Sequence, residues 1–276
     1  MKLSALIDVI KPKQTLLLMI TFLIPFSVAG GRDLIPPLAT FLAISGTTAL
    51  NMWLDRDIDA MMLRTRKRPV PAGELSPETC AIYGTILFLL GFYLALITRL
   101  EFALVLLLGL FFDIFVYTVM LKRRSPYSII IGGLAGAMPA LAGWIVVKGF
   151  TIPGFIMASI VFLWIPSHIW FIAIHYEEDY RNTGIPMFPV IFGVEKTVKA
   201  IILSTILMIG AVVALYFYLP MHPIYFLISI PPATYFLIKS IKFAMEPSKT
   251  MAKKMYKIAS IKLGFIFLAI MLASAI

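Results

Sequence analysis

The chain has 276 residues, of which 61% are hydrophobic, and its mean hydropathy is +0.95. Globular domains are about 45–50% apolar, so this composition excludes an ordinary soluble fold and requires that part of the surface faces lipid. The net charge of +10 would indicate a nucleic-acid partner in a soluble protein. Here its distribution between loops has a topological explanation, and no nucleic-acid partner is expected.

Apolar runs long enough to cross a bilayer recur along the whole chain. They are nine in number and cover residues 14–30, 34–54, 79–98, 102–121, 127–147, 153–174, 198–219, 223–238 and 258–276. The runs are long and lack two-residue alternation, which favours helices over barrel strands. The sequence therefore predicts an all-α polytopic membrane protein, with about nine transmembrane helices in a single transmembrane domain over residues 1–276.

The basic residues are divided unequally between the two sides of this arrangement. If the N-terminus is cytoplasmic, 20 of the 24 Lys and Arg residues, Lys2 among them, fall on the inner side. Only Arg32, Arg99 and Lys148 fall on the outer side. This asymmetry follows the positive-inside rule. It predicts a multi-pass protein of the cell membrane whose active site faces the cytoplasm, among the longer inner loops at 55–78, 175–197 and 239–257.

Charged motifs at the inner helix ends follow a repeating order. The second and sixth runs end in acidic residues, whereas the fourth and eighth are followed by basic residues. This order predicts a pseudo-repeat of two four-helix units plus one helix. Repeated units commonly place a binding site between their halves.

The first acidic motif carries Asn51, Asp55 and Asp59 at intervals of four residues. On a helix these side chains form one stripe, which is costly at a membrane edge unless it binds a cation. Magnesium usually takes one or two carboxylates together with substrate phosphate. The motif predicts Asp55 and Asp59 as Mg²⁺ ligands, and a solvated helix end is the alternative. Asp57 points off the stripe, which favours a salt bridge.

Basic side chains follow this motif and the fourth run. Arg64 and Arg68 have guanidinium forks that match phosphate oxygens, and two prolines stiffen the chain after Arg68. Lys122 and Arg123 stand at the inner end of the fourth helix, where a cation can hold a departing diphosphate. These four residues are the predicted diphosphate ligands. The alternative is plain topogenic charge.

The second acidic motif contains Glu178 and Asp179. Adjacent residues on a helix point about 100° apart, so one can bind a second Mg²⁺ while the other binds a basic partner. The sequence does not decide which of the two is the metal ligand. A charged loop without metal is the alternative.

Three further residues lie within apolar runs or at their start. An intramembrane histidine such as His168 indicates function; it can ligate haem iron or contact a substrate acid, or else bond to another helix. Asp113 is also an ionisable residue within an apolar run, and the sequence predicts no role for it. Cys80 is the single cysteine, which excludes an intrachain disulfide and a cysteine metal site.

These motifs resemble the UbiA superfamily of intramembrane prenyltransferases, whose signature Asn-x3-Asp-x3-Asp is met by residues 51–59. Within that superfamily they are very similar to the haem O synthase (protoheme IX farnesyltransferase) branch. The similar segments are residues 51–73, 116–126, 131–139, 166–170 and 179–190. The resemblance extends over residues 11–193.

The resemblance implies a nine-helix bundle around a central cavity. It implies Mg²⁺-dependent conversion of haem b, farnesyl diphosphate and water to haem O and diphosphate, with catalytic roles for Asn51, Asp55, Asp59 and Lys122. Membrane lipid and the assembly of haem-using oxidases are the further partners that it implies. Many superfamily members have a second Asp-x3-Asp, and this chain has tyrosines in that register.

Two other functions remain open at this stage. One is prenyl transfer to a quinone precursor or to a glyceryl-phosphate lipid. The other is a transporter or channel, which the gathering of the acidic residues at one face argues against.

Overall fold

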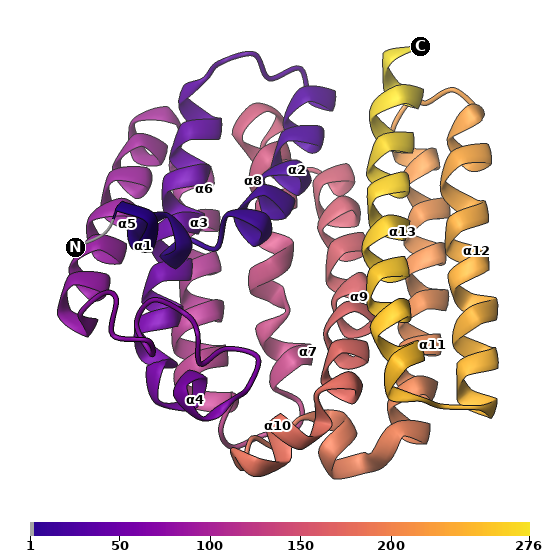
Figure 1. The fold of residues 1–276 in the computed structure, drawn as a ribbon. Helices are drawn as coiled ribbons and strands as arrows, with labels where there is room; N and C mark the ends of the chain where they lie inside the picture. The colour runs from indigo at the N-terminus through magenta and orange to yellow at the C-terminus, as the bar shows by residue number, and fades with distance from the viewer. Residues whose placement is uncertain (1–2) are drawn as a thin grey trace.

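The computed structural model describes residues 3–276, and its regular elements are helices (Figure 1). Lys2, one of the predicted inner basic residues, lies outside the described residues. The first half holds α1 (Leu3–Val9), α2 (Pro12–Val28), α3 (Ile35–Leu54), α4 (Arg56–Met61), α5 (Pro77–Thr98), α6 (Leu100–Leu110) and the π-helix η1 (Phe111–Leu121). The second half holds α7 (Ser128–Gly132), α8 (Leu134–Lys148), α9 (Ile152–His175), α10 (Glu177–Asn182), α11 (Phe188–Tyr218), α12 (Ile224–Met245) and α13 (Lys249–Ala275).

Seven helical segments within residues 3–276 are long and apolar enough to cross a membrane. The number is eight if α1 and α2, which meet at a bend of 47°, form one span. The helix α3 has 20 residues but is not among the seven, because several hydroxyl side chains and Asn51 lower its hydropathy. The predicted all-α polytopic fold is confirmed, and the predicted count of about nine spans is approximate.

Proline in the first turn starts α2, α3, α5, α9 and α11, a position where its missing N–H costs nothing. Two helices begin earlier in the chain than predicted: α11 begins at Phe188 and not at residue 198, and α13 begins at Lys249 and not at residue 258. The loops predicted at 175–197 and 239–257 are therefore largely helical. Hydropathy marks only the lipid-embedded part of a helix, and these helices continue beyond it in charged turns.

The pair α3 and α5 packs at very close range. A Cβ atom on Gly46 would lie 2.5 Å from the Phe88 backbone nitrogen, and one on Gly91 would lie 2.5 Å from the Ala39 carbonyl oxygen. Small residues permit such an approach between membrane helices. The contact fixes α3, whose last turn carries Asn51, the first residue of the first acidic motif.

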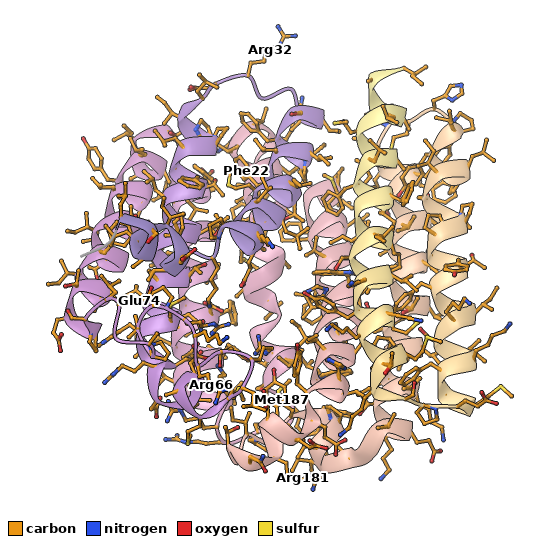
Figure 2. The ribbon with its side chains drawn as sticks, viewed as in Figure 1. Phe22, Arg32, Arg66, Glu74, Arg181 and Met187 are labelled. Atoms are coloured by element: carbon orange, nitrogen blue, oxygen red, sulfur yellow. The ribbon has the colours of Figure 1, made fainter. Side chains whose placement is uncertain are left out.

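The bundle has two distinct ends. The short helices α4 and α10 lie at one end (Figure 1), where Figure 2 also places Arg66 and Arg181, while Arg32 lies at the opposite end. The predicted acidic and basic motifs thus share one end of the molecule. The pseudo-repeat of two four-helix units stays a prediction.

Candidate functional site

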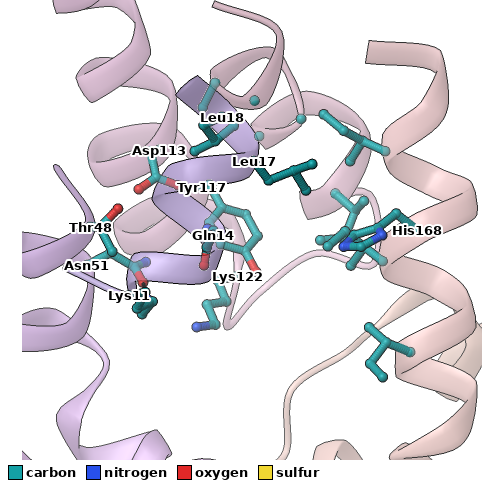
Figure 3. Close-up of a pocket in the computed structure, with 18 of the residues that line it drawn as sticks. Lys11, Gln14, Leu17, Leu18, Thr48, Asn51, Asp113, Tyr117, Lys122 and His168 are labelled. Atoms are coloured by element: carbon teal, nitrogen blue, oxygen red, sulfur yellow. Dashed lines mark hydrogen bonds between the residues drawn. The ribbon is translucent and has the colours of Figure 1, made fainter. Parts of the chain in front are cut away.

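A cavity of about 490 Å³ opens between the helices, and it brings together most of the predicted site residues (Figure 3). Its walls come from α2, α3, α4 and the segment after it, η1, α7, α8, α9, α10 and α13. The predicted residues that line it are Asn51, Asp55, Asp59, Arg64, Arg68, Lys122 and His168.

The first acidic motif keeps its stripe although the helix breaks within it. The helix α3 ends at Leu54 and α4 begins at Arg56, yet the Asp55 N–H still donates to the Asn51 carbonyl at 3.0 Å. The Asp59 N–H likewise donates to the Asp55 carbonyl at 2.8 Å. The four-residue spacing therefore survives the break, and all three side chains face the cavity.

Asp55 and Asp59 are almost fully buried, at 1% and 2% exposure. Asp55 Oδ2 accepts a hydrogen bond from Lys122 Nζ at 2.5 Å, and Asp59 Oδ2 accepts one from Arg68 Nη1 at 2.6 Å. Asp55 Oδ1 is buried and has no hydrogen-bond partner among residues 3–276. A buried carboxylate oxygen without a partner is costly, so this atom is suited to a ligand that enters the cavity.

Both the oxygen and the nitrogen of the Asn51 side-chain amide form hydrogen bonds. Its Oδ1 accepts from Lys11 Nζ at 2.9 Å, and its Nδ2 donates to Thr118 Oγ1 at 2.9 Å. Thr118 in turn donates to the Asp113 carbonyl at 2.7 Å. In this arrangement Asn51 connects α3 to the start of α2 and to η1, and its oxygen is taken by Lys11.

Lys11 is a site residue that the sequence analysis missed, since it counted Lys11 only as topogenic charge. It stands at the bend between α1 and α2 with a left-handed backbone, φ 47°, and it lines the cavity. Such strain in a non-glycine residue is typical of functional sites. The only sequence signal is Pro12, which marks a helix start directly after it.

The π-helix η1 turns Asp113, Tyr117 and Lys122 toward the cavity together. Its bonding pattern is seen where the Lys122 N–H donates to the Tyr117 carbonyl, five residues earlier, at 2.8 Å. A helix with such bonds has roughly 4.4 residues per turn, so the step of nine residues from Asp113 to Lys122 makes about two turns. In an α-helix they would make about 2.5 turns and point to opposite sides. Asp113 thereby joins the site.

The two residues of the second acidic motif lie next to each other in α10 but point in different directions. Asp179 is buried and accepts from the Arg64 N–H at 3.3 Å. The Glu178 side chain is 78% exposed and pairs with Lys249, and that hydrogen bond lowers the pKa of Glu178.

The structure corrects the prediction for Glu178, because adjacent helical residues diverge and this one points outward, away from the cavity. Neither Glu178 nor Asp179 lines the cavity. Within residues 3–276, no three His, Cys, Asp or Glu side chains are grouped to hold a metal. A divalent cation at this site would therefore depend on few protein ligands.

Arg123 also differs from its prediction as a diphosphate ligand. Its two Nη atoms donate to the two carboxylate oxygens of Asp57, each at 2.7 Å, outside the cavity lining. This bidentate pair lowers the pKa of Asp57 and confirms the predicted salt bridge of that residue. Lys122 enters the cavity and Arg123 turns away, as neighbouring positions on a helix do.

His168 lies on the α9 wall, across the cavity from Asp113 (Figure 3). Its ring lies between those of Trp164 and Tyr256, with centroid distances of 4.3 and 4.4 Å. Its Nδ1 is 3.1 Å from Ser260 Oγ, and the Ser260 hydroxyl donates to the Tyr256 carbonyl at 3.3 Å. When Nδ1 carries the ring proton, Ser260 accepts it and Nε2 keeps a free lone pair.

The donor set fits a divalent cation with a diphosphate. Magnesium usually needs only one or two carboxylates when phosphate oxygens complete its shell, and Asp55 Oδ1 is an unsatisfied hard oxygen of that kind. Lys122, Arg64 and Arg68 line the same cavity. The site can thus hold a polyanion and its counter-cation beside an apolar interior.

Solved structures with the same fold are known. The structure described for digeranylgeranylglyceryl phosphate synthase superposes with a TM-score of 0.82 at 19% identity, covering 99% of this chain and 98% of that one. A UbiA homologue from Archaeoglobus fulgidus bound to DMAPP and Mg²⁺ superposes with a TM-score of 0.68 at 15% identity, covering 96% and 98%. At these identities the likeness concerns the fold alone.

Sequence comparison gives information on the family as well as on the fold. A protoheme IX farnesyltransferase from Archaeoglobus fulgidus is 57% identical to this chain over 275 residues, which cover 98% of each protein. The UbiA prenyltransferase family matches residues 12–269. The chain therefore belongs to the UbiA prenyltransferase family.

Proposed function

We propose that this protein transfers the farnesyl group of farnesyl diphosphate to haem b, with addition of water, and releases haem O and diphosphate. The observation that carries the proposal is the cavity in which Asp55, Asp59, Lys122 and Arg68 meet. The choice of substrates rests on the farnesyltransferase that is 57% identical over nearly the whole chain.

The diphosphate end of the substrate belongs among these charges. Lys122 and Arg68 are within reach of the buried carboxylates and can turn to phosphate oxygens, while Arg64 lines the same wall. Asp55 and Asp59 would hold Mg²⁺, which when bound neutralises diphosphate charge and makes diphosphate a better leaving group. A UbiA homologue of the same fold was solved with DMAPP and Mg²⁺, which supports a role for Mg²⁺ in this proposal.

The chain's own residues lower the barrier in two ways. As the carbon–oxygen bond of farnesyl diphosphate breaks, negative charge builds on the diphosphate, and Lys122 and Arg68 are already placed to stabilise it. The farnesyl cation that remains must be protected from water. Apolar residues from α2 and α9 line the cavity, among them Leu17, Leu18, Ile165 and Ile169. An apolar lining of this kind keeps water away from the cation.

His168 is the residue that supports haem as the acceptor. Its Nδ1 lies within hydrogen-bond distance of Ser260 Oγ and its ring lies between two aromatic side chains. The free Nε2 suits an axial iron ligand. We infer that haem b binds against the α9 wall.

The end of the bundle that carries Arg66 and Arg181 (Figure 2) would face the cytoplasm of the cell membrane, in keeping with the positive-inside rule. The N-terminus would lie on the same side. Haem O made there would pass to the assembly of haem-using oxidases.

Product analysis tests the proposal. Vesicles that contain the purified protein, given haem b, farnesyl diphosphate and Mg²⁺, should form haem O as detected by mass spectrometry, and EDTA should abolish its formation. Prenylation of a phenolic or glycerol acceptor in place of haem b would replace the proposal with another activity of the family.

The same preparation tests the haem site by titration. His168→Ala should weaken haem binding, followed by the change in the haem absorbance band, while binding of farnesyl diphosphate is kept. His222→Ala, which alters an exposed histidine before α12, is the matched control. Equal haem affinity in both variants would remove His168 from the haem site.

A further inference from the structure

Asp113 differs from the other carboxylates of the cavity. Three carboxylates line it, those of Asp55, Asp59 and Asp113. Asp55 and Asp59 each form a salt bridge with a basic side chain, whereas Asp113 forms none with any described residue. An acidic side chain within a membrane bundle is expensive and indicates function.

Asp113 also stands where two cavities meet. A second cavity of about 140 Å³ shares six lining residues with the main one, and its remaining lining is mostly apolar. The shared residues are Gln14, Leu18, Thr48, Asp113, Ala135 and Gly136. Asp113 lies about two turns of η1 from Lys122, deeper in the bundle. Asp113 thus lies at the boundary between the charged part of the main cavity and the mostly apolar second cavity.

The reaction needs a proton acceptor in that region. The π electrons of a haem vinyl group form a bond to C1 of the farnesyl group, while the electrons of the C1–O bond leave with the diphosphate. The inner vinyl carbon becomes electron-deficient and takes a lone pair from water. One O–H bond of that water must then break, with its electrons kept on oxygen and its proton passed to a base.

We propose that Asp113 is the base that accepts this proton, an inference that rests on the proposed function. Asp55 and Asp59 are occupied by Lys122 and Arg68. The histidine of the cavity lies on the opposite wall (Figure 3), so an acceptor bound against His168 would lie in the space between that wall and Asp113. A carboxylate that forms no salt bridge can accept a proton from water.

Substitution of Asp113 gives a product signature that a packing role would not give. Asp113→Asn removes the base and should lower haem O formation by about 10²-fold, the low end for general base catalysis. The prenylated cation should then lose a carbon-bound proton, giving a product one water lighter than haem O. Asp113→Glu, which keeps a carboxylate, should restore part of the hydroxylated product.

Controls separate this result from misfolding and from failure of the proposed function. Asp113→Ser is a second, smaller uncharged variant, and retained farnesyl diphosphate binding reports an intact site in both. Glu101→Gln makes the same acid-to-amide change at the opposite end of the neighbouring helix and should behave as wild type. Wild-type haem O formation in Asp113→Asn would overturn the assignment, as would an equal loss of diphosphate release with no lighter product. Wild-type protein that forms no haem O would instead overturn the proposed function.

Discussion

At the scale of single residues, the site depends on charges that are buried in opposite-sign pairs. Asp55 with Lys122 and Asp59 with Arg68 are such pairs. Ion pairs of this kind recover desolvation cost poorly, so stability does not account for them. Their position on the cavity wall does, because the same charges can be shared with a diphosphate and a divalent cation.

Asp55→Asn and Asp59→Asn should each lower turnover by about 10²–10³-fold, by analogy with loss of one preorganised charge-stabilising group. The amide keeps the shape but lacks the charge that holds a divalent cation. Product formation over a range of Mg²⁺ concentrations is the measurement.

Asp57→Asn is the matched control, since Asp57 lies in α4 between the two and pairs with Arg123 in an exposed salt bridge. Such surface pairs contribute about 0–1 kcal/mol, so this variant should retain turnover. Full turnover in Asp55→Asn would show that the buried carboxylate is not a ligand.

Residue roles were predictable where the spacing along a helix fixed the direction of a side chain. They were not predictable where an ion-pair partner on another element fixed it. The four-residue spacing placed Asn51, Asp55 and Asp59 on one stripe, and all three line the cavity. Arg123 and Glu178 were predicted as ligands but pair with Asp57 and Lys249. A sequence does not show which opposite charge another helix will bring near.

At the scale of the element, the π-helical winding of η1 decides what the cavity contains. With ordinary helical winding, Asp113 and Lys122 would face opposite sides. The run over residues 102–121 predicted a membrane helix here, but hydropathy does not register a change from four-residue to five-residue bonding. Asp113 consequently had no role until the winding was known.

The close contact between α3 and α5 yields a stability prediction. Gly46→Ala places a methyl group 2.5 Å from the Phe88 nitrogen and 2.6 Å from the Gly84 oxygen, which are backbone atoms that cannot rotate away. Overpacking of this kind costs about 1–3 kcal/mol. The variant should show a lower thermal unfolding midpoint in detergent, followed by circular dichroism.

Gly210→Ala provides the comparison within α11, because a Cβ there meets nothing within 4 Å. Alanine favours a helix over glycine by roughly 0.5–1 kcal/mol, so this variant should unfold at the wild-type temperature or above. Equal midpoints for the two variants would contradict the close packing of α3 on α5.

At the scale of the whole molecule, the charge asymmetry predicts an orientation in the membrane. In a Cys80→Ala background, Arg32→Cys should react with an impermeant maleimide in intact cells. Arg66→Cys, at an exposed position near the opposite end of the bundle, should react only after permeabilisation. The reverse labelling would place the site on the outer face and refute the positive-inside argument for this chain.

The sequence by itself determined the class of structure. Hydropathy, helical period and the loop asymmetry of Lys and Arg are local properties, and they determine how a chain inserts into a bilayer. It also determined the acidic stripe and the family resemblance, which the match over residues 12–269 confirms.

Only the tertiary structure decided which charges meet. It brought Lys11 to Asn51, turned Arg123 and Glu178 outward, and placed Asp113 on the cavity wall without a cationic partner among the described residues. The physical reason is that these contacts join residues far apart in the chain, most of them on different helices. They depend on crossing positions and helical winding, for which a linear pattern has no signal.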